Sequence, residues 1–397
     1  MSLSPSQPTP HNIHQFHPPP QPTYILRGHT AQIHSISFFR RNHRLISGDA
    51  DGWIIIWNVS IKRPVAVWRA HGAAVLGVGT WGEERILTHG RDNKLLVWLL
   101  RETDEAGLSR VLPIEDAVSE RKKPWLLHSL DVNALNFCSF AIYPRRTGIL
   151  EESSSNPQTQ TENLTIAVPG YDDGYINLTH LPSETRKATI PSPQGLKTGL
   201  LMAVDLHAST ETDSITVLAG YESGHVCIWK QTAPSTYQPI YLHQTHQQPV
   251  LSLCVAPTLG CFFTSSADAL LARHALGAEQ SSPDVVQTRH AGQQALRVRG
   301  DERIFATAGW DGRARVYAAK SMKELAVLKW HKEGCYALAF GDVIDSDENS
   351  TQPNTAGTGD VVKRELTVSQ RRVAMTAKTH WLAAGSKDGK VSLWDIY

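Results

Sequence analysis

Three residue types that could form a hydrolase triad recur at fixed spacing along this chain. His29, Ser47 and Asp51 would supply an imidazole, a hydroxyl and a carboxylate, the groups that serve as base, nucleophile and orienting acid in serine hydrolases. The same types come twice more in the same order, as His71, Thr88 and Asp92 and as His290, Thr307 and Asp311. Because one enzyme does not need three copies of a nucleophile, we interpret the repeats as structural and expect neither a catalytic residue nor enzyme activity.

A tryptophan completes two of these sets and gives them a structural meaning. Trp57 follows Asp51 by six residues, and Trp98 follows Asp92 by six. An indole N–H can donate to a hydroxyl, the hydroxyl can bond an imidazole, and the imidazole can bond a carboxylate. A buried network of this kind is directional and firm when every polar group is paired. We therefore predict structural tetrads, whose members are His29, Ser47, Asp51, Trp57, His71, Thr88, Asp92, Trp98, His290, Thr307, Asp311, Asp388 and Trp394.

The residues between His29 and Trp57 indicate which elements must position them. Residues 28–58 contain three short runs in which apolar and polar residues alternate, and polar turn residues separate these runs. This period of two is typical of β-strands. A unit that opens with Gly-His and ends with Trp resembles a WD repeat, which forms one blade of a β-propeller.

The chain repeats this unit, although most copies are less regular. Residues 70–98 reproduce its offsets, and we count five further units, at residues 128–179, 246–274, 290–317 and 331–394 and before Trp229. A blade takes ~40–45 residues, so seven units fit the length of this chain. The sequence therefore predicts an all-β fold, a seven-bladed WD40 β-propeller.

Both ends of the repeat region predict how the ring closes. Residues 24–26 form an apolar run before the first unit, and the last unit lacks a fourth strand after Trp394. We expect the N-terminal run to pair with the last blade, which leaves no open strand edge. The predicted domains are a disordered tail rich in Pro, Gln and His at residues 1–22 and the propeller at residues 23–397, with insertions at about 101–123, 145–162 and 341–372.

The composition is that of an ordinary folded protein, and it argues against several functions. Hydrophobic residues make up 41% of the chain and charged residues 19%. A net charge of +1 gives no electrostatic case for direct nucleic-acid or membrane binding. The five cysteines have no close paired spacing, which is typical of a reducing compartment. We expect no cofactor and no bound metal.

Two of the eleven tryptophans are candidates for partner binding. Trp53 and Trp310 flank turns between strands, where they could reach a face of the ring, and tryptophan is enriched at binding hot spots. The alternative is that they fill space between blades. Residues 310–313, Trp-Asp-Gly-Arg, resemble a signature with which some propellers dock onto ubiquitin-ligase adaptors. Since Trp310 precedes the turn instead of ending a strand, turn chemistry explains this string better.

Longer strings resemble one family, densely over residues 24–140 and again at the C-terminus. They are YILRGH at residues 24–29, SGDADGW at 47–53, RPVAVWRAH at 63–71, THGRDNK at 88–94, PWLLH at 124–128, DVN at 131–133, NFC at 136–138 and HWLAAGSKDGK at 380–390. Together they are similar to the fungal ASTRA-associated WD-repeat proteins, relatives of the G-protein-β-subunit-like proteins. Residues 145–289 contain little that is specific to this family.

The resemblance implies a non-catalytic scaffold subunit of the nuclear ASTRA complex, linked to chromatin remodelling. The partners that it implies are a large kinase-like scaffold protein, its co-chaperones and RuvB-like AAA+ ATPases. No partner-binding residue can be assigned from this resemblance, because the motifs that define the family belong to the scaffold of the fold. Two other functions stay open: a substrate receptor of a cullin-type ubiquitin ligase, and an enzyme with a site in the central channel.

Overall fold

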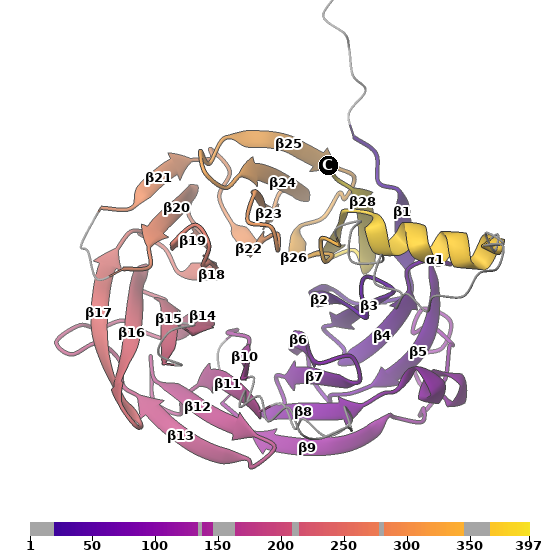
Figure 1. Cartoon of the computed structure of the whole chain (residues 1–397), viewed down its shortest axis with the longest axis horizontal. Coiled ribbons are helices and arrows are strands. Elements are labelled where there is room, and N and C mark those ends of the chain that lie inside the picture. Colours follow the sequence, from indigo (N-terminus) through magenta and orange to yellow (C-terminus); the bar gives the residue numbers. More distant parts are fainter. Residues whose placement is uncertain (1–19, 134–136, 146–162, 209–213, 278–281, 345–365) are drawn as a thin grey trace, which may run out of the picture.

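Seven four-stranded antiparallel sheets form a closed ring in the computed structural model of this protein (Figure 1). The structure describes residues 20–133, 137–145, 163–208, 214–277, 282–344 and 366–397. The first strand of each sheet faces the central channel, and the fourth lies at the rim of the disc (Figure 1). The predicted all-β, seven-bladed propeller is therefore confirmed.

The blades are numbered in chain order, and their strands are given from the channel outward. Blade 1 comprises β2 (Ile33–Phe39), β3 (Arg44–Asp49), β4 (Trp53–Asn58) and β5 (Arg63–Arg69). Blade 2 comprises β6 (Val75–Trp81), β7 (Arg85–Gly90), β8 (Lys94–Leu99) and β9 (Trp125–Asp131). Blade 3 comprises β10 (Ala141–Arg145), β11 (Asn163–Pro169), β12 (Ile176–Leu181) and β13 (Thr185–Ile190).

The remaining four blades follow the same order. Blade 4 comprises β14 (Leu201–Ala208), β15 (Ile215–Tyr221), β16 (His225–Ala233) and β17 (Thr236–Gln244). Blade 5 comprises β18 (Val250–Ala256), β19 (Cys261–Ser266), β20 (Leu270–Ala275) and β21 (Asp284–Gln287). Blade 6 comprises β22 (Gln293–Val298), β23 (Ile304–Gly309), β24 (Arg313–Ala318) and β25 (Glu324–Lys329). Blade 7 comprises β26 (Cys335–Phe340), β27 (Trp381–Ser386), β28 (Lys390–Asp395) and β1 (Tyr24–Arg27).

The middle strands are buried on both faces because a neighbouring blade packs against each face. All five residues at 53–57 of β4 are buried. Ile55 lies in one apolar cluster with Leu393 of blade 7, whereas Ile54 lies in another with Val75 of blade 2. Since a single blade cannot cover both of its own faces, the stability of each blade depends on its neighbours.

The N-terminal strand closes the ring as predicted. β1 pairs with β28 in antiparallel register, from Tyr24 opposite Leu393 to Arg27 opposite Lys390. Leu26 is only 2% exposed and packs into the cluster between blades 7 and 1. The edge of β28 is thereby covered by a strand that comes from the other end of the chain.

The segment predicted as an insertion at residues 101–123 folds against the outside of blade 1. It contains the 3-10 helix η1 (Glu102–Gly107). Glu105 of η1 is buried and lies 2.8 Å from Nη2 of Arg44, which is also buried. The backbone N–H of Val67 on β5 donates to the carbonyl of Ser109 at 2.8 Å. The insertion therefore adds to the rim of blade 1 and links it to blade 2.

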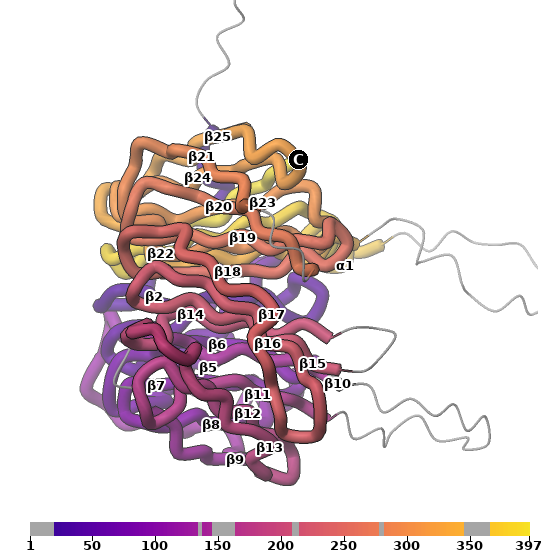
Figure 2. Tube along the Cα trace, turned by 90° about the vertical axis from the view of Figure 1, so that its left-hand side faces the viewer, coloured from indigo at the N-terminus to yellow at the C-terminus, as the bar shows by residue number. Residues whose placement is uncertain are grey.

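The two faces of the ring carry different features. One face, here called the helix face, carries the helix α1 (Val368–Lys378) (Figure 2). The turn between β2 and β3 lies on the same face. Asn42 of that turn holds α1 through a bond to the carbonyl of Ala377 at 3.1 Å. The opposite face, called the tetrad face, carries His29 and the turn between β3 and β4. No helix in the described part of the chain is long and apolar enough to cross a membrane.

Several predicted boundaries fall outside the described residues. Of the predicted tail at residues 1–22, residues 1–19 are not described, and the same holds for residues 146–162 of the second insertion. Within the third insertion, predicted at 341–372, residues 345–365 lie outside the description, and α1 continues beyond the predicted end.

Removing β1 should destabilise the ring, because β28 would become an open edge and Leu26 would leave its buried position. We expect deletion of residues 1–27 to lower the melting temperature by roughly 5 °C or more relative to deletion of residues 1–19. Differential scanning fluorimetry of the two truncated proteins measures this difference. Equal melting temperatures would contradict a stabilising role for the closing strand.

Candidate functional site: polar tetrads and the channel mouth

Blade 1 contains a buried hydrogen-bonded chain of four side chains. The Trp57 indole N–H donates to the Ser47 hydroxyl at 2.8 Å, and this hydroxyl lies 2.7 Å from His29 Nε2. His29 Nδ1 lies 2.6 Å from Asp49 Oδ2. The prediction of Asp51 as the carboxylate is therefore wrong: Asp51 is exposed, and Asp49 takes its place.

Strand register explains why the carboxylate comes from this position. Asp49 is the last residue of β3 and pairs with Ile33 at the start of β2. The equivalent residue of blade 2 is Gly90, which pairs with Val75. A Cβ atom built at Gly90 would lie 2.2 Å from Nδ1 of His71, so a side chain at this place points at the imidazole. Blade 1 fills the place with a carboxylate, whereas blade 2 takes its carboxylate from the following turn.

Blade 2 brings together His71, Thr88, Asp92 and Trp98. The Trp98 N–H donates to the Thr88 hydroxyl at 2.9 Å, and this hydroxyl lies 2.8 Å from His71 Nε2. His71 Nδ1 lies 2.9 Å from Asp92 Oδ1, and the Gly72 N–H donates to Oδ2 at 2.9 Å. Burial opposes the charged form of Asp92, but the hydrogen bonds from His71 and Gly72 outweigh it and lower the pKa of this carboxyl.

Blade 5 forms a related network in which a histidine stands in the position of the tryptophan. His246 lies 3.0 Å from the Thr264 hydroxyl through Nε2 and 3.0 Å from Asp268 through Nδ1. The same hydroxyl lies 3.0 Å from His274 Nε2, and His274 Nδ1 lies 2.9 Å from the Tyr241 hydroxyl. Burial, and then the neighbouring His246, lowers the pKa of His274 to about 3, so this ring is neutral at physiological pH.

Blade 6 does not form the predicted tetrad of His290, Thr307 and Asp311. His290 makes its hydrogen bonds through its backbone N–H and carbonyl. Asp311 instead pairs with the guanidinium of Arg315, at 2.6 Å, and the Arg315 side chain is only 1% exposed. Arg315 lies on β24 directly opposite Thr307. This expectation was wrong because an arginine from the third strand takes the carboxylate that an imidazole binds in blades 1, 2, 5 and 7.

Blade 7 takes its hydroxyl from the third strand. Ala384 stands where blades 1, 2, 5 and 6 have Ser or Thr, but Ser392 on β28 lies opposite it. The Ser392 hydroxyl lies 2.9 Å from His331 Nε2 and accepts the Trp394 N–H at 2.8 Å. His331 Nδ1 lies 3.4 Å from Asp388. Against the effect of burial, the hydrogen bond with His331 lowers the pKa of Asp388 to about 2. Asp388 and Trp394 thus belong to one network, as expected, although the sequence did not indicate Ser392.

Blades 3 and 4 do not form the tetrad within the described residues. In blade 3, Asp173 is exposed. His128, which was expected to open this unit, lies on β9 of blade 2 and bonds Glu184 at 2.7 Å. In blade 4, Tyr221 occupies the register position of Asp49, and its hydroxyl accepts the Trp229 N–H at 3.3 Å.

The tetrad hydroxyls are not placed to act as nucleophiles. Ser47 and Thr88 are 0% exposed, and each is engaged by an indole on one side and an imidazole on the other. A nucleophile has to reach the reacting atom of a substrate, so the geometry favours the structural interpretation. Among the residues that the structure describes, no group of three or more His, Cys, Asp or Glu side chains is placed to hold a metal ion.

The two tryptophans proposed for partner binding differ in accessibility. Trp53 is only 3% exposed, and the guanidinium of Arg121 lies 4.4 Å from its ring centre. It packs in the core between blades 7 and 1, so it is not available to a partner in this structure. Trp310 is 47% exposed, and its N–H donates to Gln294 Oε1 at 2.9 Å. Of these two tryptophans, only Trp310 offers an exposed surface at the tetrad face.

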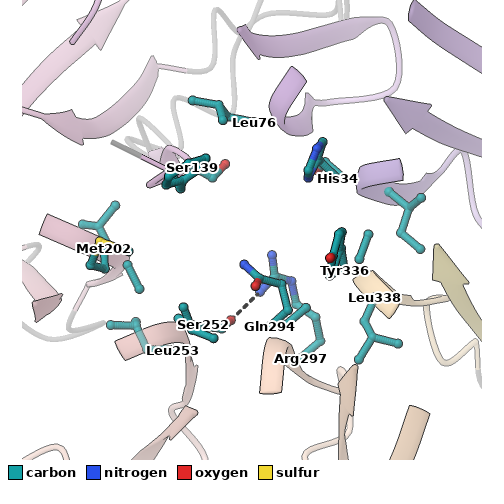
Figure 3. Close-up of a pocket in the computed structure, with 18 of the residues that line it drawn as sticks. His34, Leu76, Ser139, Met202, Ser252, Leu253, Gln294, Arg297, Tyr336 and Leu338 are labelled. Atoms are coloured by element: carbon teal, nitrogen blue, oxygen red, sulfur yellow. Dashed lines mark hydrogen bonds between the residues drawn. The ribbon is translucent and has the colours of Figure 1, made fainter. Parts of the chain in front are cut away.

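Residues that the sequence analysis did not single out line the mouth of the central channel (Figure 3). His34 of β2 stacks on Tyr336 of β26, with ring centres 5.9 Å apart and planes inclined by 9°. Gln294, the partner of Trp310, and Arg297 both come from β22 and point into the channel (Figure 3). Alternation along the inner strands was a signal for channel-facing residues, but only the closed ring shows which of them meet.

Asp49→Ala should destabilise the protein, and Asp51→Ala should not. Besides bonding His29, the Asp49 carboxylate accepts the N–H groups of Asp51 and Trp53 at 3.0 and 2.9 Å. Its loss leaves a buried imidazole and two turn amides unpaired, at a cost of about 2–4 kcal/mol in the free energy of unfolding. Urea denaturation measures the loss, and D51A is the matched control. Equal losses in the two variants would contradict the assignment of Asp49.

His89 of β7 should make the protein less stable under mildly acidic conditions. Its buried ring lies edge-on to Phe140, with centres 6.2 Å apart, and burial followed by the charge of His71 lowers the His89 pKa to about 4. The unfolded-state value is about 6.5. His89 therefore contributes its full stability above about pH 6.5, and this contribution is lost as the pH falls toward about 4. Urea denaturation of the wild type and His89→Leu across this range should show a flatter pH dependence for the variant; parallel curves would refute the role.

Comparison with known proteins places the chain in one family. The model of the family described as ASTRA-associated protein 1 matches residues 22–394. The ASTRA-associated protein 1 of Penicillium rubens is 45% identical and covers 96% of this chain and 99% of its own length. That of Verticillium alfalfae is 47% identical, over 95% and 93% of the two chains, and that of Schizosaccharomyces pombe is 33% identical, over 81% and 93%. The chain therefore belongs to the ASTRA-associated protein 1 family.

Proposed function

We propose that this protein is a non-catalytic scaffold subunit of the nuclear ASTRA complex and takes part in chromatin remodelling. The observation behind this proposal is the family match. The chain matches relatives named ASTRA-associated protein 1 over nearly their whole length. Following the resemblance, its partners are other ASTRA subunits: a large kinase-like scaffold protein, its co-chaperones and RuvB-like AAA+ ATPases. It binds them through the faces and loops of the ring, without direct contact to nucleic acid or membrane.

The geometry supports a binding role over a catalytic one. The hydroxyls that resemble nucleophiles are fully buried in the blades, where they hold strands together. A rigid ring presents many turns at fixed positions, which suits a protein that binds several partners. Trp310 is a half-exposed aromatic side chain whose position is fixed by the bond to Gln294. A preordered aromatic residue of this kind binds at a low cost in conformational entropy.

Affinity purification from the native cell, followed by mass spectrometry, tests the proposed function. The tagged chain should bring down ASTRA subunits, and imaging of the same cells should place it in the nucleus. Recovery of a cullin and its adaptor instead would favour the substrate receptor of a ubiquitin ligase. Hydrolase activity of the pure protein that Ser47→Ala abolishes without loss of stability would favour an enzyme.

Trp310→Ala should weaken the recovery of these partners without lowering the melting temperature. Loss of a central aromatic contact costs about 2 kcal/mol or more in binding free energy, or roughly thirtyfold in affinity. Trp125→Ala is the matched control, because Trp125 is 74% exposed but lies on β9 at the rim of the disc. An equal loss in both variants would mean that the tetrad face has no special role in binding.

A further inference from the structure

The central channel is a continuous space to which all seven blades contribute (Figure 3). The part toward the tetrad face is a cavity of about 120 Å³, and the part toward the helix face is a cavity of about 640 Å³. Ile36, Arg297 and Leu338 line both parts, so the two meet at these residues. The smaller cavity lies below the ~300–1,000 Å³ of small-molecule sites. Its size suits a single side chain better than a metabolite.

Arg297 points into this channel with unused hydrogen-bond donors (Figure 3). Its Nη1 donates to the Leu296 carbonyl at 2.8 Å and lies 3.4 Å from the Ser252 hydroxyl. These two contacts hold the guanidinium in place. Within the described residues, no carboxylate lies within ion-pair distance of Arg297, and Nε and Nη2 donate to no protein atom. A positioned, unpaired guanidinium is suited to bind an oxyanion.

None of the described carboxyl groups around the channel forms an ion pair with Arg297. Asp205 accepts two backbone N–H groups, at 2.9 and 3.1 Å; burial raises its pKa, and these hydrogen bonds and the charge of Arg297 oppose that effect only in part. Asp301 lines the larger cavity but is paired with Arg299 at 2.7 Å. Burial also raises the pKa of Asp342, at the mouth on the helix face. Arg297 is the one strongly charged side chain among the described residues that line the smaller cavity.

We propose that the channel binds the carboxylate side chain of an extended segment from a partner protein, and that Arg297 is its charged anchor. One guanidinium balances one carboxylate and can bond both of its oxygens. A nucleic acid carries a row of phosphates, and a protein that binds it needs several positive charges to pair with them. The net charge of this chain is only +1, which favours a single carboxylate as the ligand. The proposal rests on the proposed function, because the segment belongs to a partner in the same assembly.

The mouth of the channel provides contacts for the residues on either side of this carboxylate. The Trp310 indole is held by Gln294, which itself lines the channel. On the neighbouring blades, the stacked pair of Tyr336 and His34 presents flat rings at the same mouth. Burial lowers the pKa of His34, so its ring adds no positive charge at neutral pH. Arg297 therefore supplies the charge, and the rings supply apolar contact area.

Site-specific crosslinking in the purified native assembly tests this proposal. Met202, on the channel wall (Figure 3), is replaced by the photoreactive residue p-benzoylphenylalanine, and the crosslinked peptides are identified by mass spectrometry. We expect a crosslink to a partner segment that has Asp or Glu within a few residues. Arg297→Gln should reduce its yield at least about tenfold, and Arg297→Lys should reduce it less, because glutamine removes the charge that pairs with the carboxylate and lysine keeps it. Arg303→Gln, whose native side chain is 83% exposed outside the channel, should leave the yield unchanged.

The outcomes separate this proposal from the proposed function. If wild-type protein recovers ASTRA subunits but the crosslink is absent, or persists unchanged in R297Q at an unchanged melting temperature, the channel site is refuted and the scaffold role stands. A crosslink to nucleic acid, to this chain itself or to a segment without an acidic residue also overturns the proposal. If the wild type recovers no ASTRA subunit, the proposed function is refuted, and the channel proposal, which rests on it, is refuted with it.

Discussion

The need to pair buried polar groups inside each blade is the constraint on which the rest of the ring depends. An imidazole such as His29 enters the blade between the loop that precedes the first strand and the turn that follows the second, where it is 4% exposed. An unpaired polar group at that depth would cost about 1–3 kcal/mol. Paired on both sides, at 2.7 Å to Ser47 and 2.6 Å to Asp49, the same ring ties the loop, the strand and the turn together.

The blades meet this constraint with different residues. Blade 1 uses a carboxylate at the end of its second strand, blade 7 takes its hydroxyl from Ser392 on the third strand, and blade 6 replaces the imidazole with Arg315. Blade 4 fills the space with Tyr221, whose hydroxyl accepts an indole N–H. What these blades share is a buried place that a polar side chain fills, with partners that differ from blade to blade.

Rigid blades have a consequence for the channel. The inner strands can project side chains such as Arg297 and His34 into a common space only because their spacing is fixed by the sheets behind them. A guanidinium held in position by backbone and hydroxyl oxygens keeps its remaining donors directed into the channel, so little conformational entropy is lost when a ligand binds. The proposed scaffold role and the proposed carboxylate site therefore depend on the same buried networks, which position the binding groups without contacting the ligand.

The sequence alone determined the seven units, the all-β fold, the closing strand and the network of blade 2, because local alternation and constant offsets reflect backbone geometry directly. It failed for Asp51 and His290, since equal spacing does not reveal which side chain points inward when a neighbouring residue such as Asp49 or Arg315 can reach the same space. The burial of Trp53 and the meeting of Arg297, His34 and Tyr336 in the channel were likewise decided by tertiary structure. Both depend on segments distant in sequence that meet only when the ring closes.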